Sequence, residues 1–278
     1  MSSDVKYVEA NGLRFAYLEE GTGPLVLLIH GFPDTAHTWD DVRPALASWG
    51  YRAVSPFTRG YAPTAVPEVE DYGADTLGQD IVALIDALGD GQPVILVGHD
   101  WGASGAYAAA AQEPDKIRFL VTVAIPHPAS ITPTPRLIWG ARHFFSLSRK
   151  NSAKKTRKND FALIDTLVRR WAPTWDVPAD EMKYVKETFA DPRCLDAALG
   201  YYRALGRKLP AGHRKKISVP TVAIGGEDDP VLKPKAYAKA ASRFTGDYST
   251  VIMPGGHFLH REHPARFLEE LRAVLPPA

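Results

Sequence analysis

A short segment in the first half of the chain restricts the fold most. Residues 94–102 have the sequence Val-Ile-Leu-Val-Gly-His-Asp-Trp-Gly. The apolar run 94–97 predicts a buried parallel strand, and the alanine-rich stretch 103–111 predicts a helix packed closely behind it. A sharp strand-to-helix turn between flanking glycines exposes its central side chain. The segment therefore predicts an α/β sheet that presents the carboxylate of Asp100 at the end of a strand.

A carboxylate presented in this way can attack a saturated carbon. The product is an alkyl ester, which water can cleave at the carbonyl carbon of the carboxylate. A serine attacking the same carbon would leave an ether that could not be turned over. Asp100 therefore favours substrates such as epoxides or alkyl halides over esters, amides and lipids. One alternative is that Asp100 only caps the helix. Ser104 is the weaker nucleophile candidate because it falls inside the predicted helix.

Composition excludes several other functions. The 278 residues suffice for one large α/β domain with an insertion or for two small domains. Lys and Arg together number 33 against 32 Asp and Glu, so the overall charge predicts neither nucleic acid nor an anionic membrane as a partner. A single cysteine, Cys194, excludes an intramolecular disulfide. The N-terminal residues lack a secretory signal, and no apolar run approaches the roughly 20 residues of a membrane span, so we expect a cytoplasmic protein.

Hydrophobic patterning organises the chain into alternating elements. Two strand candidates, 6–10 and 13–18, flank Asn11-Gly12, which favours a hairpin turn. Strand and helix candidates then alternate, as expected for a parallel sheet covered on both faces. The strands are expected at 25–29, 51–55, 94–97, 117–124, 219–224 and 249–253, and the helices at 39–48, 76–88, 103–112, 234–243 and 263–274.

The alternation is interrupted between residues 128 and 210. This part contains helix-like segments without strands and begins at the proline-dense stretch 131–135. We therefore expect an α/β core of residues 1–127 and 211–278, with residues 128–210 forming a helical lid over the edge of the sheet where the strands end.

Two further loops at this edge supply groups for ester hydrolysis. His257 follows the strand predicted over 249–253, and Gly226-Glu-Asp-Asp-Pro follows the strand over 219–224. His257 can deprotonate water while a carboxylate behind it stabilises the imidazolium. Asp229 is favoured as that carboxylate because it directly precedes Pro230, and Asp228 and Glu227 are substitutes. The nearby His260 and His263 are expected to be exposed residues at a helix start.

Hydrolysis of the ester also requires an oxyanion hole. Phe32 lies in the turn His30-Gly-Phe-Pro after the strand predicted over 25–29, and its backbone N–H can point toward Asp100. The N–H of Trp101, directly after Asp100, would be the second donor.

These motifs resemble the α/β-hydrolase superfamily and, within it, the branch that contains epoxide hydrolases and haloalkane dehalogenases. The resemblance covers nearly the whole chain through His30-Gly-Phe-Pro, Arg59-Gly-Tyr, Gly98-His-Asp-Trp-Gly and Gly256-His-Phe in this order. It implies a mostly parallel eight-stranded sheet with an inserted helical cap, and a reaction that needs no cofactor and no metal.

Epoxide hydrolases use two lid tyrosines to protonate the epoxide oxygen, and the resemblance assigns one of these to Tyr202 in the segment 197–203. At the other position the chain departs from the pattern and carries His143, and some members of the branch use a His-Tyr pair. The expected product is a vicinal diol. Trp139, Phe144, Phe145 and Tyr201 are expected to line a pocket for a small apolar epoxide, in a monomer or homodimer.

Two alternatives stay open. A haloalkane dehalogenase would use the same nucleophile and triad, with the indole of Trp101 and a second donor, Trp139, Trp171 or Trp175, holding the halide. A protein of this fold could also only bind a ligand. The basic stretch 149–158 is expected to be a solvated part of the lid, with a surface that attracts an anionic substrate or partner as the alternative.

Overall fold

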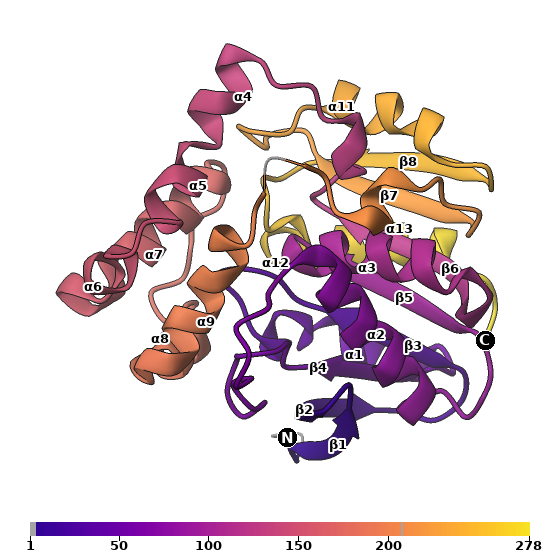
Figure 1. The fold of residues 1–278 in the computed structure, drawn as a ribbon. Coiled ribbons are helices and arrows are strands. Elements are labelled where there is room, and N and C mark those ends of the chain that lie inside the picture. Colours follow the sequence, from indigo (N-terminus) through magenta and orange to yellow (C-terminus); the bar gives the residue numbers. More distant parts are fainter. Residues whose placement is uncertain (1–3, 207) are drawn as a thin grey trace.

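The structure is a computed structural model that describes residues 4–206 and 208–278. Its centre is an eight-stranded sheet in the order β1-β2-β4-β3-β5-β6-β7-β8 (Figure 1). The hairpin strands β1 and β2 are antiparallel to each other, and β2 also pairs antiparallel with β4. The remaining neighbours are parallel. The strands are β1 (Lys6–Ala10), β2 (Leu13–Glu20), β3 (Leu25–Ile29), β4 (Arg52–Pro56), β5 (Val94–His99), β6 (Ile117–Val123), β7 (Thr221–Gly226) and β8 (Tyr248–Met253).

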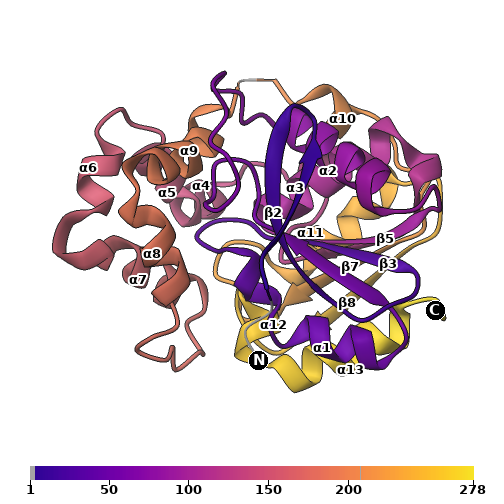
Figure 2. The same cartoon turned by 90° about the horizontal axis from the view of Figure 1, so that it is seen from below.

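Helices cover both faces of this sheet (Figure 2). One face packs against α1 (Val42–Ser48) and α13 (Pro264–Val274) through a core that includes Leu46 and Phe267. The other face packs against α2 (Ala74–Leu88) and α3 (Trp101–Gln112) through a core that includes Leu84 and Tyr107. Every residue of β3 and β5 is buried, as a parallel strand covered on both faces requires. The predicted α/β-hydrolase fold with a mostly parallel eight-stranded sheet is confirmed.

A set of helices lies beside the sheet and joins β6 to β7. We call α4 to α9 the inserted helices. Figure 1 shows them as a separate layer, away from the flanking helices. They are α4 (Pro135–Gly140), α5 (Arg142–Leu147), α6 (Ser152–Thr156), α7 (Lys158–Trp171), α8 (Lys183–Ala190) and α9 (Pro192–Arg203). The chain returns to the sheet through α10 (Ala211–Arg214), and α11 (Pro234–Lys239) and α12 (Leu259–Glu262) follow β7 and β8.

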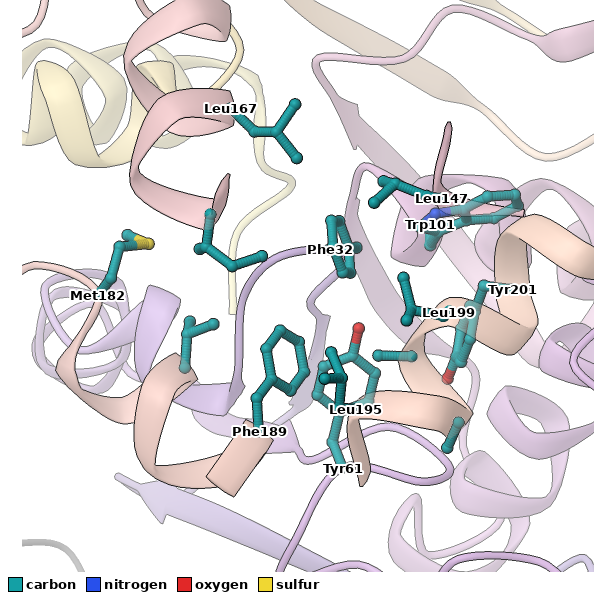
Figure 3. Packing of buried hydrophobic residues seen from close by; sticks show 14 of the residues in the cluster. Phe32, Tyr61, Trp101, Leu147, Leu167, Met182, Phe189, Leu195, Leu199 and Tyr201 are labelled. Carbon is teal, nitrogen blue, oxygen red and sulfur yellow. The ribbon is translucent and has the colours of Figure 1, made fainter. Parts of the chain in front are cut away.

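A third hydrophobic core joins the inserted helices to the edge of the sheet. Figure 3 shows Phe32 of the loop after β3 and Trp101 at the start of α3 beside Leu199 and Tyr201 of α9. The core continues to Phe189 of α8, whose ring stacks on that of Phe32 with centroids 5.9 Å apart. Burial of these aromatic side chains fixes the inserted helices over the loops that follow β3 and β5.

Sequence patterning located these elements well, with shifts of one or two residues at most ends. Two expected helices differ. The one over 234–243 continues after α11 as a 3₁₀ helix, η4 (Ala240–Arg243), and in the one over 39–48 the chain forms a short 3₁₀ helix, η1 (Ala36–Trp39), before α1. The Thr35 hydroxyl accepts a hydrogen bond from His37 N–H and starts this turn early. Among the described residues, no helix combines the length and apolar character needed to cross a bilayer.

Candidate active site

Asp100 occupies the turn between β5 and α3 in a conformation that few residues adopt. Its φ is 52° and its ψ is −119°, outside the helical region, and its side chain makes no capping hydrogen bond. The close approach of the turn to β3 requires Gly102, because a Cβ atom there would lie 2.3 Å from the carbonyl oxygen of Ile29. Strained backbone of this kind concentrates at functional sites. The helix-capping alternative for Asp100 is therefore wrong.

Both carboxylate oxygens of Asp100 have partners from distant parts of the chain. Oδ1 accepts a hydrogen bond of 2.8 Å from the backbone N–H of Phe32, and Oδ2 lies 3.2 Å from Nε2 of His257. Each partner stands on a loop directly after a strand, β3 for Phe32 and β8 for His257. The parallel strands thus bring the three loops to one edge of the sheet.

His257 lies between two carboxylates. Its Nδ1 is 3.4 Å from Oδ2 of Asp229, which is 1% exposed. The other oxygen of Asp229 accepts hydrogen bonds from the N–H groups of Val231 and Leu232. Asp228, the substitute considered from the sequence, instead accepts a hydrogen bond from the N–H of Gly255. Of the three acidic residues in this loop, Asp229 is the one in contact with the imidazole.

Charge pairing outweighs burial in this triad. Burial alone would lower the pKa of His257, but its hydrogen bonds to Asp100 and Asp229 raise it to about 9. Burial would raise the pKa of Asp100, but the hydrogen bond and charge of His257 hold that pKa below its usual value. Asp100 is thus ionised at neutral pH, as a nucleophile must be.

The two backbone N–H groups of the expected oxyanion hole lie close to Gly31. A Cβ atom on Gly31 would lie 2.4 Å from Oδ1 of Asp100 and 2.6 Å from the backbone nitrogen of Trp101. The amides of Phe32 and Trp101 therefore both lie beside the same carboxylate. This arrangement can stabilise negative charge that develops on an Asp100 oxygen.

Tyr202 and His143 of the inserted helices come together above this carboxylate. The ring of Tyr202 lies edge-on to Trp101 and Phe32, with centroids 5.3 and 5.1 Å apart, and 6.1 Å from the ring of His143. Burial, and then the charge of Asp100, raise the pKa of Tyr202 well above its usual value, so the phenol keeps its proton. Burial lowers the pKa of His143 to about 3, so this imidazole is neutral.

A cavity of about 670 Å³ adjoins these groups. Asp100, Trp101, His143 and His257 line it, and so do the predicted pocket residues Phe144 and Tyr201. Much of the remaining wall is apolar and comes from Ile125, Ile131, Leu137, Val231 and Leu232. Tyr202 is not in this lining, since its ring is enclosed by Phe32, Trp101 and Phe144.

Two predicted pocket residues lie elsewhere. Trp139 is 70% exposed and Phe145 is 64% exposed, and neither contributes to the cavity wall. Successive side chains of an α-helix point about 100° apart. The helix α5 therefore directs His143, Phe144 and Leu147 inward and Phe145 outward. The prediction that Trp139 and Phe145 line the pocket is wrong.

The prediction of an exposed His260 is also wrong. His260 is buried, with Nε2 2.7 Å from the hydroxyl of Thr38. Its ring packs against His99, with centroids 4.5 Å apart, beneath the turn that carries Asp100. The two apolar residues directly before it, Phe258 and Leu259, are buried as well and are the sequence signal of a buried segment.

Sequence reasoning also missed a support for the site in the inserted helices. The carbonyl of Trp171 accepts a hydrogen bond of 2.9 Å from His257 N–H, and the Trp171 ring lines the cavity. Arg261 joins Asp34 of the sheet loops to Glu181 of the insertion. These contacts run between segments far apart in the sequence, so no local pattern indicates them.

One group of side chains in the described ranges has the composition of a metal site. Potential ligand atoms of Asp34, His99 and His260 lie within 4.8 Å of one another. The Asp34 carboxylate is already paired with the guanidinium of Arg261. This guanidinium supplies the positive charge that an ion would bring, and we assign no metal to the group.

Comparisons with known proteins agree with this architecture. The family model described as alpha/beta hydrolase fold matches residues 24–264. The chain is 30% identical to Epoxide hydrolase A of Mycobacterium tuberculosis over 97% of this chain and 96% of the relative. It is also 30% identical to Epoxide hydrolase 3 of Mus musculus, over 96% of this chain and 75% of the relative.

A solved structure extends the similarity to three dimensions. The crystal structure of an epoxide hydrolase from Vigna radiata matches with a TM-score of 0.81 and 28% identity, covering 98% of this chain and 97% of that one. These similarities span the sheet, the inserted helices and the loops that carry Asp100, Asp229 and His257. The chain is therefore an enzyme of the α/β-hydrolase family, and within that family it belongs with the hydrolases of the epoxide hydrolase kind.

Proposed function

We propose that the protein hydrolyses epoxides to vicinal diols through a covalent ester on Asp100. One observation carries the proposal. The Asp100 carboxylate is held by Phe32 N–H on one oxygen and by His257 on the other, beside an apolar cavity. A carboxylate nucleophile next to a histidine suits substrates that are attacked at carbon and released by hydrolysis of an ester.

In the first step, an oxygen of Asp100 bonds to an epoxide carbon while the bond from that carbon to the epoxide oxygen breaks. The oxygen that is freed takes a proton from the phenol of Tyr202. His143 lines the cavity near Tyr202, and its neutral ring can donate a hydrogen bond but holds no second proton to give. We therefore assign the proton transfer to Tyr202 and orientation of the oxygen to His143.

In the second step, His257 takes a proton from water, and the resulting hydroxide attacks the ester carbon of Asp100. The amides of Phe32 and Trp101 stabilise the tetrahedral oxyanion. Its collapse breaks the bond from Asp100 carbon to the substrate oxygen, which takes the proton from His257. The Asp100 carboxylic acid then gives its proton to the Tyr202 phenolate, which restores the Asp100 carboxylate and the Tyr202 phenol.

Formation of the ester prepares His257 for its role as a base. In the free enzyme, the charges of Asp100 and Asp229 help to raise the pKa of His257 to about 9. An ester at Asp100 carries no charge, so one of the two groups that favour imidazolium is removed. His257 therefore releases its proton to solvent more readily once the covalent intermediate has formed, and it takes one up again after the Asp100 carboxylate is restored.

We further propose that residues 128–210 act as a cap domain on a core of residues 1–127 and 211–278. Side chains of α4 and α5 form part of the cavity wall, and α9 carries Tyr202. The cap thus supplies the proton donor, while the core supplies the nucleophile and base. The apolar lining of the cavity fits a small apolar epoxide. The mechanism requires no cofactor.

Dehalogenation of alkyl halides is the second candidate. The indole nitrogen of Trp171 is buried beside the cavity that Trp171 lines, and it has no hydrogen-bond partner within residues 4–206 and 208–278. Such an N–H could bind a leaving halide together with Trp101. Trp139, another candidate for this role from the sequence, points to the surface.

A paired assay distinguishes the two reactions. The purified protein is incubated with matched aryl and alkyl epoxides and with bromoalkanes of the same carbon skeletons, and diol and bromide are measured. We expect diol formation that disappears in Asp100→Ala. Bromide release without diol would assign the protein to the dehalogenation reaction instead. Rapid quenching followed by mass spectrometry of the Asp100 peptide tests for the ester itself.

A further inference from the structure

The outer edge of the inserted helices carries an unusual combination of side chains. In α4 and α5, Ile138, Trp139 and Phe145 are 51%, 70% and 64% exposed. Large apolar side chains that gather on a surface mark interaction sites more often than single exposed ones do. The inward side of α5 faces the cavity, which His143 and Phe144 line.

A concentration of positive charge adjoins these apolar side chains. Residues 142–158 contain seven arginines and lysines, and all seven are exposed. Between Asp115 and Asp160 the sequence has no aspartate or glutamate, although the whole chain has a net charge of only +1. Five of the seven basic residues therefore have no acidic residue within four positions of the sequence, and the segment carries an excess of positive charge.

The helices that carry the apolar and basic side chains follow one another along the insertion. Figure 1 and Figure 2 both place α4, α5 and α6 in sequence along the inserted helices, with α6 farthest from the sheet. Lys154 and Lys155 belong to α6, and Arg142 lies over the ring of Trp139 with its guanidinium carbon 4.6 Å from the ring centroid. We call the exposed side chains of residues 138–158 the cap-edge surface.

We propose that the cap-edge surface binds the surface of an anionic lipid membrane. Lys and Arg near a membrane are attracted to anionic headgroups, while exposed Trp, Phe and Ile side chains insert at the boundary with the acyl chains. A surface that combines basic residues with exposed aromatic side chains can make both the electrostatic and the apolar contact with a membrane. The binding is peripheral and involves only side chains of this edge.

Other partners fit this surface less well. A second copy docked through the same edge would bring two sets of basic residues against each other, because a twofold interface pairs a patch with itself. A nucleic acid would explain the basic residues, but the isoleucine and the two aromatic side chains would gain little from its phosphates. The overall charge led to the expectation of no membrane partner, and the local distribution of charge replaces that expectation.

The test uses flotation of the full chain with lipid vesicles. Vesicles of phosphatidylcholine containing about one-third phosphatidylglycerol are compared with vesicles of pure phosphatidylcholine. We expect binding to the anionic vesicles, weakened by salt, and little binding to the neutral ones. No binding to anionic vesicles, or equal binding to both, would overturn the proposal.

Two pairs of substitutions separate this edge from the rest of the surface. Lys154→Gln with Lys155→Gln is expected to weaken binding roughly 30-fold, since each basic charge near an anionic surface contributes about a fivefold factor. Lys215→Gln with Lys216→Gln is the matched control, because these adjacent exposed lysines lie at the end of α10, away from the inserted helices (Figure 2). Equal losses in both variants would show attraction without a defined site and contradict the proposal.

Insertion of the aromatic side chains is tested separately. Trp139→Ala and Phe145→Ala are each expected to weaken binding about tenfold, whereas Tyr7→Ala, an exposed ring on β1, should have no effect. Lipids brominated on the acyl chains should quench tryptophan fluorescence in the parent protein but not in Trp139→Phe that is bound to the same vesicles. If binding depends on the lysines but not on Trp139 or Phe145, and heparin competes for it, the surface binds a soluble polyanion and the membrane proposal fails.

Discussion

Nε2 of His257 lies 3.2 Å from Oδ2 of Asp100, although 157 residues separate the two in the chain. The contact joins the end of β5 to the end of β8, strands that two other strands separate in the sheet. His257 reaches across this distance on the Gly255-Gly256 loop, where its N–H is fixed by the carbonyl of Trp171. Against the effect of burial, Asp100 is thus one of the two carboxylates that raise the pKa of His257.

The first prediction concerns this pKa. Asp100→Asn removes one of the two carboxylates that raise the pKa of His257 to about 9, so this pKa should fall toward the usual 6.5. Titration of the imidazole signals by NMR measures the shift. His213, whose pKa is lowered chiefly by burial and which does not contact Asp100, is the internal control. An unchanged His257 pKa in Asp100→Asn would contradict the assignment.

The same pair predicts a pH dependence of stability. The pKa of His257 is higher in the folded protein than in the unfolded chain, so protonation favours the folded state. This contribution is fully present below about pH 6.5 and is lost as the pH rises through about 9. The unfolding free energy of the parent protein should therefore fall between these pH values, and the fall should be smaller in Asp100→Asn. Urea denaturation at a series of pH values measures both curves.

The proton donor can be tested with two adjacent tyrosines. Tyr202→Phe should lower kcat for epoxides by roughly 10²- to 10⁴-fold, the usual contribution of a general acid. Tyr201→Phe is the matched control, because the Tyr201 hydroxyl donates its hydrogen bond to the carbonyl of Arg59 and is not assigned to protonate the epoxide oxygen. Steady-state kinetics on a single epoxide compares the two. A similar loss in both variants would indicate damage to α9 rather than removal of an acid.

Gly31 offers a test of the oxyanion hole. Gly31→Ala would place a Cβ atom 2.4 Å from Oδ1 of Asp100, so the carboxylate or the Phe32 loop must move. We expect kcat to fall roughly 10²- to 10³-fold, the effect of losing one oxyanion donor. Gly140→Ala in α4 is the control, since the nearest atom to its new Cβ would be a methyl carbon of Val231 at an ordinary 3.4 Å. Full activity in Gly31→Ala would show that the oxyanion groups do not converge there.

Arg261 provides a prediction about stability. It pairs with buried Asp34 and with Glu181 of the insertion. Arg261→Ala should lower the unfolding free energy by about 3–5 kcal/mol, because it leaves the Asp34 charge buried and unpaired. Arg266→Ala removes exposed pairs with Glu269 and Glu270 and should cost less than about 1 kcal/mol. Chemical denaturation of both variants would reveal the difference, and equal losses would contradict the role given to Asp34.

The sequence by itself determined the fold and most of the candidate site. Apolar runs of strand length, each followed by a helical pattern, predicted the parallel sheet, because local periodicity reflects which faces an element buries. The glycines around Asp100, and the loops that follow the strands before Asp229 and His257, could be located for the same reason. Parallel strands end at one edge of the sheet, so loops from distant parts of the sequence were expected to meet there.

Tertiary structure decided what depends on contacts between elements. The sequence favoured Asp229 but kept Asp228 and Glu227 as substitutes, and only the folded loop shows that the Asp229 carboxylate faces the imidazole. The outward direction of Trp139 and Phe145 and the burial of His260 depend on how short helices pack, which a few residues do not specify. The link from Arg261 to Asp34 spans 227 residues. Such contacts form only when the chain has folded, because folding brings together residues that are far apart in the sequence.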